Sequence, residues 1–88
     1  MYALLIATPE KVVFEGQVIS LSAPGGLGYF EVLSQHAPMI RTLTAGQLTV
    51  TDANKKKWSW FIEGGLFEVD RNQATLLADS LSLKEEKS

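Results

Sequence analysis

Gln47-Leu48-Thr49-Val50-Thr51 and Trp58-Ser59-Trp60-Phe61-Ile62-Glu63 are two runs with alternating apolar side chains, joined by the polar loop 52–57. Successive side chains of a β-strand point to opposite faces of the sheet, so this alternation buries one face and leaves the other in water. Two such runs around a short polar loop predict a β-hairpin. Trp58, Trp60 and Ile62 share one face. We expect them to fill a core, with a binding platform as the alternative use of the tryptophans.

The same period of two extends along most of the chain. Further strand-like runs lie at 2–7, 12–14, 17–23, 29–33, 39–43, 66–69 and 74–78, with Gly, Pro, Asn or Asp near their ends. Several short strands with regular turn signals predict an all-β sandwich or barrel. We therefore expect one β-sandwich domain over residues 1–80 and a short polar tail over 81–88, too short and uncapped for an independent helix.

Composition removes several classes of function. The 88 residues include no cysteine, which excludes a disulfide framework, a thiolate metal site and a cysteine nucleophile. A formal net charge of −2 gives no reason to expect nucleic acid or an acidic lipid surface as a partner. No run approaches the roughly 20 apolar residues that a membrane-spanning helix needs.

The residues that could carry chemistry do not assemble into a known motif. His36 is the single histidine, whereas a catalytic zinc site usually takes three protein ligands. Residues 24–28 are rich in glycine but lack the Gly-Lys-Ser/Thr that ends a phosphate-binding loop, and Glu31 stands where a dinucleotide fingerprint needs its third glycine. We expect no catalytic residue, no cofactor and no metal, and we interpret His36 as a loop residue bonded to backbone groups.

One stretch is more specific: Gly28-Tyr29-Phe30-Glu31-Val32-Leu33-Ser34-Gln35-His36-Ala37-Pro38-Met39-Ile40. It resembles the His-Ala-Pro segment of the epsilon subunit of F-type ATP synthase, which is called delta in mitochondria. Gly64-Gly65-Leu66-Phe67-Glu68-Val69 and Ala74-Thr75-Leu76-Leu77-Ala78-Asp79 are similar to two later motifs of that family, in the same order. Tyr29, Glu31 and Ser34 depart from the family's usual acidic residue, glycine and proline.

The resemblance implies a flattened β-sandwich of two roughly five-stranded sheets. Family members typically continue into a C-terminal helical hairpin that inhibits ATP hydrolysis, and this sequence stops where those helices would begin, so we expect neither the hairpin nor inhibition. The implied function is that of a non-catalytic central-stalk (rotor) subunit, which couples rotation of the c ring to the gamma subunit for proton-driven ATP synthesis. The alpha and beta subunits would be reached only through the complex. The chain would be peripheral, at the cytoplasmic face of an energy-transducing membrane (plasma or inner membrane, or thylakoid).

The resemblance also implies two contact surfaces. The loop formed by Gly28, Tyr29, Phe30 and Glu31 is similar in position to the part that faces the c ring, with Tyr29 and Phe30 as apolar anchors. Thr8, His36 and Arg41 fall at positions similar to those that face gamma.

Two other classes stay open. A lipoyl or biotinyl carrier domain is also small, all-β and acidic, and it would carry a modified lysine on the 52–57 hairpin loop. Lys55, Lys56 and Lys57 are there, but not in the short turn motif such domains use. A small β-barrel enzyme of cupin type would need more histidines than this chain has.

Overall fold

The computed structural model describes residues 1–87, which form nine strands and no helix. The strands are β1 (Tyr2–Ala7), β2 (Val12–Gly25), β3 (Gly28–Leu33), β4 (Met39–Leu43), β5 (Gly46–Asp52), β6 (Lys57–Ile62), β7 (Gly65–Asp70), β8 (Gln73–Ala78) and β9 (Leu81–Lys87). None of the described segments is a helix long and apolar enough to cross a membrane.

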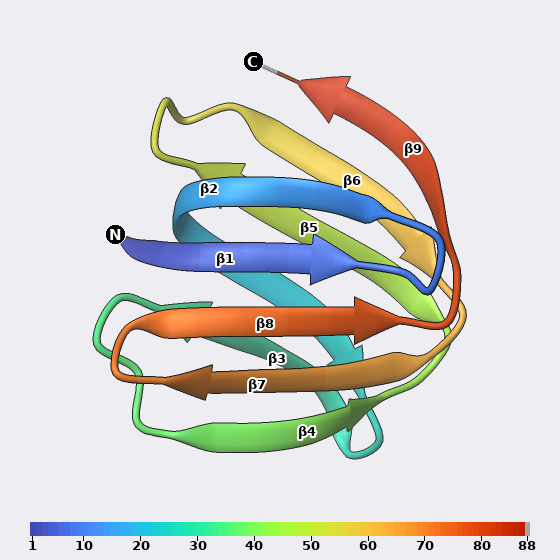
Figure 1. The fold of residues 1–88 in the computed structure, drawn as a ribbon, viewed down its shortest axis with the longest axis horizontal. Coiled ribbons are helices and arrows are strands. Elements are labelled where there is room, and N and C mark those ends of the chain that lie inside the picture. The colour runs from blue at the N-terminus through green and yellow to red at the C-terminus, as the bar shows by residue number, and fades with distance from the viewer. Residues whose placement is uncertain (88) are drawn as a thin grey trace.

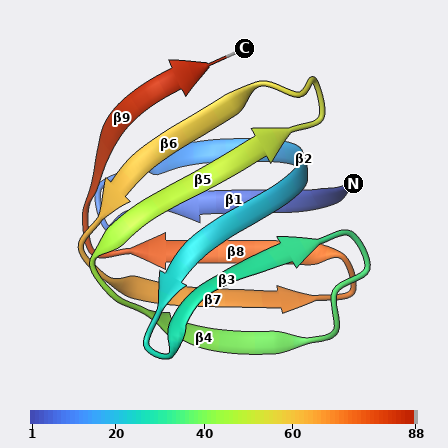
Figure 2. The same ribbon diagram turned by 180° about the vertical axis from the view of Figure 1, so that it is seen from behind.

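The strands pack as two layers that share β2 (Figures 1 and 2). The front layer has the order β2–β1–β8–β7–β4, and the back layer has the order β3–β2–β5–β6–β9. The first half of β2 pairs with β1 as far as Val18, and its second half pairs with β3 and β5 from there on. The pairing of β1 with β8 is parallel, while the other pairings are antiparallel. This arrangement confirms the expected all-β sandwich of two roughly five-stranded sheets.

The core lies between the two layers and takes alternate side chains from nearly every strand. Tyr2, Leu4 and Ile6 of β1 face the interior, while Ala3, Leu5 and Ala7 face outward. The other buried apolar side chains are Val18, Leu21, Ala23, Val32, Leu43, Leu48, Val50, Trp60, Ile62, Phe67, Val69, Ala74, Leu76 and Ala78. The alternation in the sequence therefore translates directly into burial.

Trp58, Trp60 and Ile62 lie where core packing was expected. Trp60 and Ile62 are buried, and Trp58 is half-buried against the core. The rings of Trp58 and Trp60 stack with centroids 6.1 Å apart, and the Phe14 ring meets both edge-on. Offset and edge-to-face contacts of this kind add to the energy of burial.

Two segments differ from what the sequence indicated. The runs 12–14 and 17–23 form the single strand β2, because Gly16 adopts an extended pairing with Leu4 and does not end the strand. Residues 81–87, set apart above as a polar tail, form β9 and pair with β6. Leu81 packs against the core there, and the β9 backbone satisfies the donors and acceptors at the edge of β6, which a polar sequence does not reveal.

Candidate interaction surfaces

Residues 28–31, which the family resemblance treats as a loop, form the first part of strand β3, in agreement with the strand-like run predicted at 29–33. They pair with Ser22, Ala23, Pro24 and Gly25 of β2 in a tight hairpin whose tip is Gly26 and Leu27. Gly28 has a φ of 118°, a backbone conformation open to glycine and strained for other residues. The Leu27 side chain is 92% exposed at the tip. The hairpin thus presents an apolar residue that the sequence analysis did not single out, although a large side chain among three glycines is a visible signal.

Tyr29 and Phe30 point to opposite faces of β3, as neighbours in a strand must. Tyr29 is 62% exposed, and its hydroxyl accepts a hydrogen bond of 2.9 Å from the Gln47 backbone N–H. Phe30 turns inward, with its ring centroid 5.6 Å from that of Phe67. The expectation that both aromatics are surface anchors is therefore corrected for Phe30, which packs against the core.

Arg41 lies on β4 beside the same ring. It pairs with Phe67 across the sheet, so its side chain starts from the inward face, and its guanidinium carbon lies 5.5 Å from the Phe30 ring centroid. A cation over an aromatic face is a favourable arrangement. The half-buried Arg41 of β4 thus covers the Phe30 ring of β3.

The turn after β1, which contains Thr8, and the β3–β4 connection, which contains His36, lie at opposite ends of the sandwich (Figure 1). Thr8 follows β1 in a turn closed by a 2.9 Å hydrogen bond from its backbone N–H to the Lys11 carbonyl. His36 lies in the connection from β3 to β4, and its Nδ1 is 2.7 Å from the Ala37 carbonyl oxygen. The backbone contact agrees with the reading of His36 as a loop residue. The structure does not bring Thr8, His36 and Arg41 together at one point.

An exposed apolar row crosses the outer face of the front layer. Its members are paired neighbours in successive strands: Val12 with Ala7, Ala7 with Leu77, and Leu77 with Leu66. Ala7 is half-buried and the other three are exposed. We call this set the front apolar row. Its two middle members, Ala7 and Leu77, border a shallow hollow of about 240 Å³, which is also lined by Thr8, Pro9, Ala78 and Asp79.

This row was not expected from the sequence, because both faces of the runs 66–69 and 74–78 carry apolar residues. Phe67 and Leu76 face the core, while Leu66 and Leu77 face out. Apolar residues at consecutive positions of a strand are the signal that could have revealed the row. Alternation explains the burial of one face only, so apolar residues on both faces indicate that the second face is also covered.

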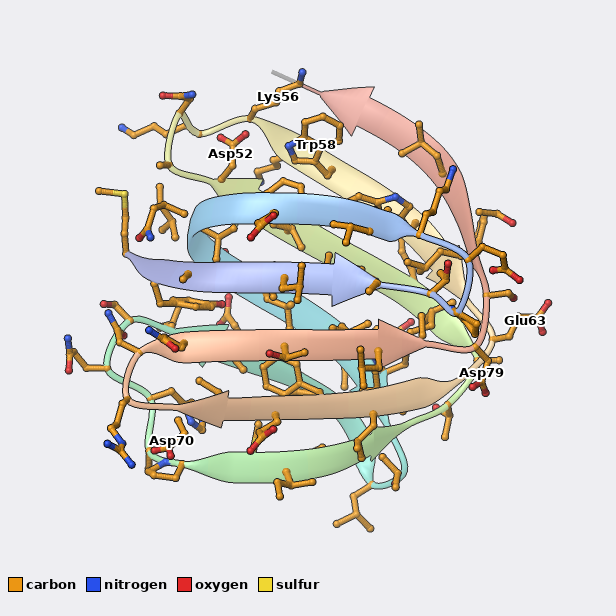
Figure 3. The ribbon with its side chains drawn as sticks, in the orientation of Figure 1. Asp52, Lys56, Trp58, Glu63, Asp70 and Asp79 are labelled. Carbon is orange, nitrogen blue, oxygen red and sulfur yellow. The ribbon has the colours of Figure 1, made fainter. Side chains whose placement is uncertain are left out.

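The loop between β5 and β6 is organised around Asp52 (Figure 3). Its carboxylate accepts hydrogen bonds from Trp58 Nε1 at 3.1 Å and from the backbone N–H groups of Asn54 and Lys56 at 2.8 and 3.0 Å. The bond from Trp58, with help from the backbone bonds, lowers the pKa of Asp52. The Lys56 ammonium lies 4.4 Å from the Trp58 ring centroid. Lys56 therefore folds onto an aromatic ring, unlike the projecting lysine of a carrier domain.

Residues 1–84 match the protein family described as ATP synthase, Delta/Epsilon chain, beta-sandwich domain. The chain is 41% identical over 81 residues to the ATP synthase epsilon chain of Chlorobium limicola, covering 92% of both chains. It is 42% identical over 86 residues to the ATP synthase epsilon chain of Protochlamydia amoebophila, covering 98% of this chain and 58% of that relative.

Solved structures share the fold at low sequence identity. A chain of the Euglena gracilis mitochondrial ATP synthase (OSCP/F1/c-ring, rotational state 1) superposes with a TM-score of 0.85 at 20% identity, covering 91% of this chain and 51% of that one. A chain of the Tetrahymena thermophila mitochondrial ATP synthase central stalk and c-ring gives a TM-score of 0.75 at 17% identity, covering 90% and 63%. The described sandwich thus spans between half and two thirds of these structural neighbours.

Proposed function

The chain belongs to the beta-sandwich domain family of ATP synthase delta/epsilon chains, and we propose that it is a rotor subunit that couples the c ring to the gamma subunit. The observation that carries this proposal is the family match over residues 1–84, which takes in nearly all of the described sandwich. One structural neighbour belongs to the OSCP/F1/c-ring assembly of the Euglena gracilis enzyme, and the other belongs to the central stalk and c-ring of the Tetrahymena thermophila enzyme. No chemistry is assigned to the chain; its role in ATP synthesis is mechanical.

The fold suits a mechanical role. A stiff part transmits torque with little twist, and close-packed protein interiors are weakly compressible. Strand β2 runs through both layers, so the hydrogen-bonded backbone is continuous from one layer to the other. A small domain also gains stability when partners bind its native state.

We assign the gamma subunit to the outer face of the front layer. Contiguous exposed apolar patches on soluble domains mark interaction sites, and the front apolar row is such a patch. Thr8 lines the hollow that borders Ala7 and Leu77 of that row. The family resemblance also implies gamma contacts for His36 and Arg41. His36 would reach that interface from the opposite end of the sandwich, and Arg41 from beside the Phe30 ring, not from the outer face.

We assign the c ring to the tip of the β2–β3 hairpin. Leu27 and Tyr29 offer exposed apolar area there, Gly28 gives the turn its shape, and Glu31 adds a charged group on the outward face of β3. Phe30 contributes indirectly by packing the base of the hairpin on the core. The chain would then be peripheral to the membrane through the complex, at its cytoplasmic face, and would meet the alpha and beta subunits only through that complex.

The carrier-domain alternative has no support. The family match and the relatives compared above are ATP synthase chains. Asp52 and Trp58 also hold the 52–57 loop in a fixed shape in which Lys56 lies against a ring.

Co-purification with the gamma subunit of the same organism tests the proposal. We expect the chain to bind gamma stoichiometrically and the double variant Leu66→Ser/Leu77→Ser to lose most of that binding. Leu33→Ser is the matched control, because Leu33 and Leu77 are both 51% exposed but Leu33 lies on the back layer. If the wild-type chain forms no stoichiometric complex with gamma, the proposed rotor function is wrong. If the double variant binds gamma as tightly as the wild-type chain, the front apolar row is not part of the gamma interface.

A further inference from the structure

Asn72 links three chain segments at one end of the sandwich. It lies in the turn between β7 and β8, beside the β3–β4 connection and the start of β1 (Figure 1). Its Oδ1 accepts a hydrogen bond of 2.8 Å from the Gln35 backbone N–H, and its Nδ2 donates one of 2.7 Å to the Met1 carbonyl. The Ser34 hydroxyl donates to the same Met1 carbonyl at 3.3 Å.

The turn itself does not require these bonds. Asn72 has a φ of 62°, which asparagine tolerates and glycine adopts freely. Glycine would therefore satisfy the backbone of the turn, and what asparagine adds is the pair of side-chain bonds to residues far away in the sequence. A side-chain amide is suited to this, since it offers an acceptor and a donor at once.

The Asn72 side chain holds the β3–β4 connection at Gln35, next to Ser34, which is bonded to Met1. Gln35 has a φ of 64°, an uncommon conformation for a residue with a Cβ, and its N–H is the group that Asn72 holds. Among the hydrogen bonds described for residues 1–87, those that tie the exposed connection to distant segments reach Asn72 and Met1, and they include a 3.2 Å bond from the Met1 ammonium to the Ser34 hydroxyl. The bond of His36 to the Ala37 carbonyl is local to the connection.

We propose that Asn72 is a positioning residue, which fixes the Ser34–Gln35 turn and thereby sets the direction in which His36, Ala37 and Pro38 face the gamma subunit. The positioning of the turn stands on the hydrogen bonds alone, while its consequence for gamma rests on the proposed function. Asn72 need not touch gamma itself, because it acts through the connection.

The test uses three variants of the full chain. Asn72→Gly keeps the positive φ and removes both side-chain bonds. Asn72→Asp keeps the acceptor for the Gln35 N–H and removes the donor to the Met1 carbonyl. Arg71→Gly is the matched control, since Arg71 has a φ of 49° in the same turn and its side chain is exposed.

Two readouts separate the proposal from the proposed function. The Gln35 amide proton, followed by NMR temperature coefficient and exchange, reports the turn without any partner. We expect Asn72→Gly to lose its protection, and Asn72→Asp and Arg71→Gly to retain it. Affinity for gamma should fall about five- to tenfold in Asn72→Gly, the effect of losing one to two hydrogen bonds, and change less than twofold in Arg71→Gly.

An unchanged Gln35 amide in Asn72→Gly would overturn the positioning of the turn. Equal affinities of Asn72→Gly and Arg71→Gly, with protection lost in the first alone, would overturn the link to gamma. If the wild-type chain does not bind gamma while the Gln35 amide responds as expected, the proposed function fails and the positioning of the turn is supported.

Discussion

Tyr2 brings a hydroxyl group into the apolar core. Its side chain is buried, and the hydroxyl donates a 2.8 Å hydrogen bond to the Val32 carbonyl of β3. Burial raises the pKa of the Tyr2 phenol well above its ordinary value of 10.0, and the nearby Glu31 carboxylate raises it further. The bond joins the first strand of the front layer to the edge strand of the back layer, so one residue helps to hold the layers together.

Replacing Tyr2 by phenylalanine should remove this bond and keep the ring. We expect a loss of about 1–2 kcal/mol in the free energy of unfolding at pH 7, because a buried hydrogen bond is lost. Since the folded pKa of the phenol is raised, its contribution is fully present below pH 10 and is lost as the pH rises toward the folded value.

Urea unfolding at pH 8 and near pH 11 measures both effects. The wild-type chain should lose more stability between the two pH values than Tyr2→Phe does, with the lysines titrating equally in both. An equal loss in the two proteins would show that Tyr2 does not contribute to the alkaline limit.

Tyr29 and Phe30 show where sequence reasoning reaches its limit at the residue scale. The family resemblance treats residues 28–31 as a loop, in which both rings could face a partner. In the structure they continue the alternation of β3, so a step of one residue separates a surface ring from a core ring. The role of Asn72 was also out of reach, because its partner Gln35 lies 37 residues away and no local pattern links them.

At the scale of elements, the alternating runs predicted the positions of most strands correctly. They predicted strand boundaries, and which runs belong to one continuous strand, less well. The runs 2–7 and 39–43 match β1 and β4, since an apolar strand bounded by turn residues is a strong local signal. The passage of β2 from one layer to the other near Val18 depends on which strands lie beside it. β9 is missed for the same reason: its polar sequence becomes a strand because β6 offers an unpaired edge.

Two glycines of the front layer, Gly65 and Gly16, differ in the space available for a Cβ atom. Gly65 begins β7 between β4 and β8, and a Cβ there would collide with the Leu77 carbonyl oxygen and lie 3.0 Å from the Ala78 Cα. Both obstacles are backbone atoms, which cannot move aside without disturbing the ladder. Gly16 in β2 is different, since a Cβ there meets the Phe14 ring at an ordinary 3.8 Å.

We expect Gly65→Ala to destabilise the chain by about 2–3 kcal/mol, as overpacking against a fixed neighbour does. Gly16→Ala should be neutral or stabilising by up to about 1 kcal/mol, because alanine restricts the unfolded chain. Thermal unfolding of the two variants side by side gives the comparison. A Gly16→Ala variant as unstable as Gly65→Ala would mean that general flexibility, and not the close approach of β8, governs both positions.

At the scale of the whole molecule, the two proposed contact surfaces lie on different layers of one sandwich. The front apolar row runs across the outer face of the front layer, while the hairpin tip belongs to β2 and β3 of the back layer. Force applied at the tip reaches the front layer through β2, which is hydrogen-bonded into both layers. The separation means that the two contacts can be weakened independently, which a single shared interface would not allow.

Weakening the hairpin tip alone should therefore uncouple rotation from transport. In the assembled ATP synthase, the double variant Leu27→Ser/Tyr29→Ser should lower ATP-driven proton pumping several-fold, because two exposed apolar anchors of the proposed c-ring contact are lost. ATP hydrolysis by the soluble sector does not use that contact, so its rate should stay within about twofold of the wild-type rate. Tyr29→Phe keeps the ring and removes the acceptor for the Gln47 N–H, so it separates contact area from the order of the hairpin. Leu33→Ser, at the far end of β3, controls for the loss of an exposed apolar side chain. Pumping that falls equally in Leu33→Ser would place the contact elsewhere on the back layer, and unchanged pumping in the double variant would remove the hairpin tip from the c-ring interface.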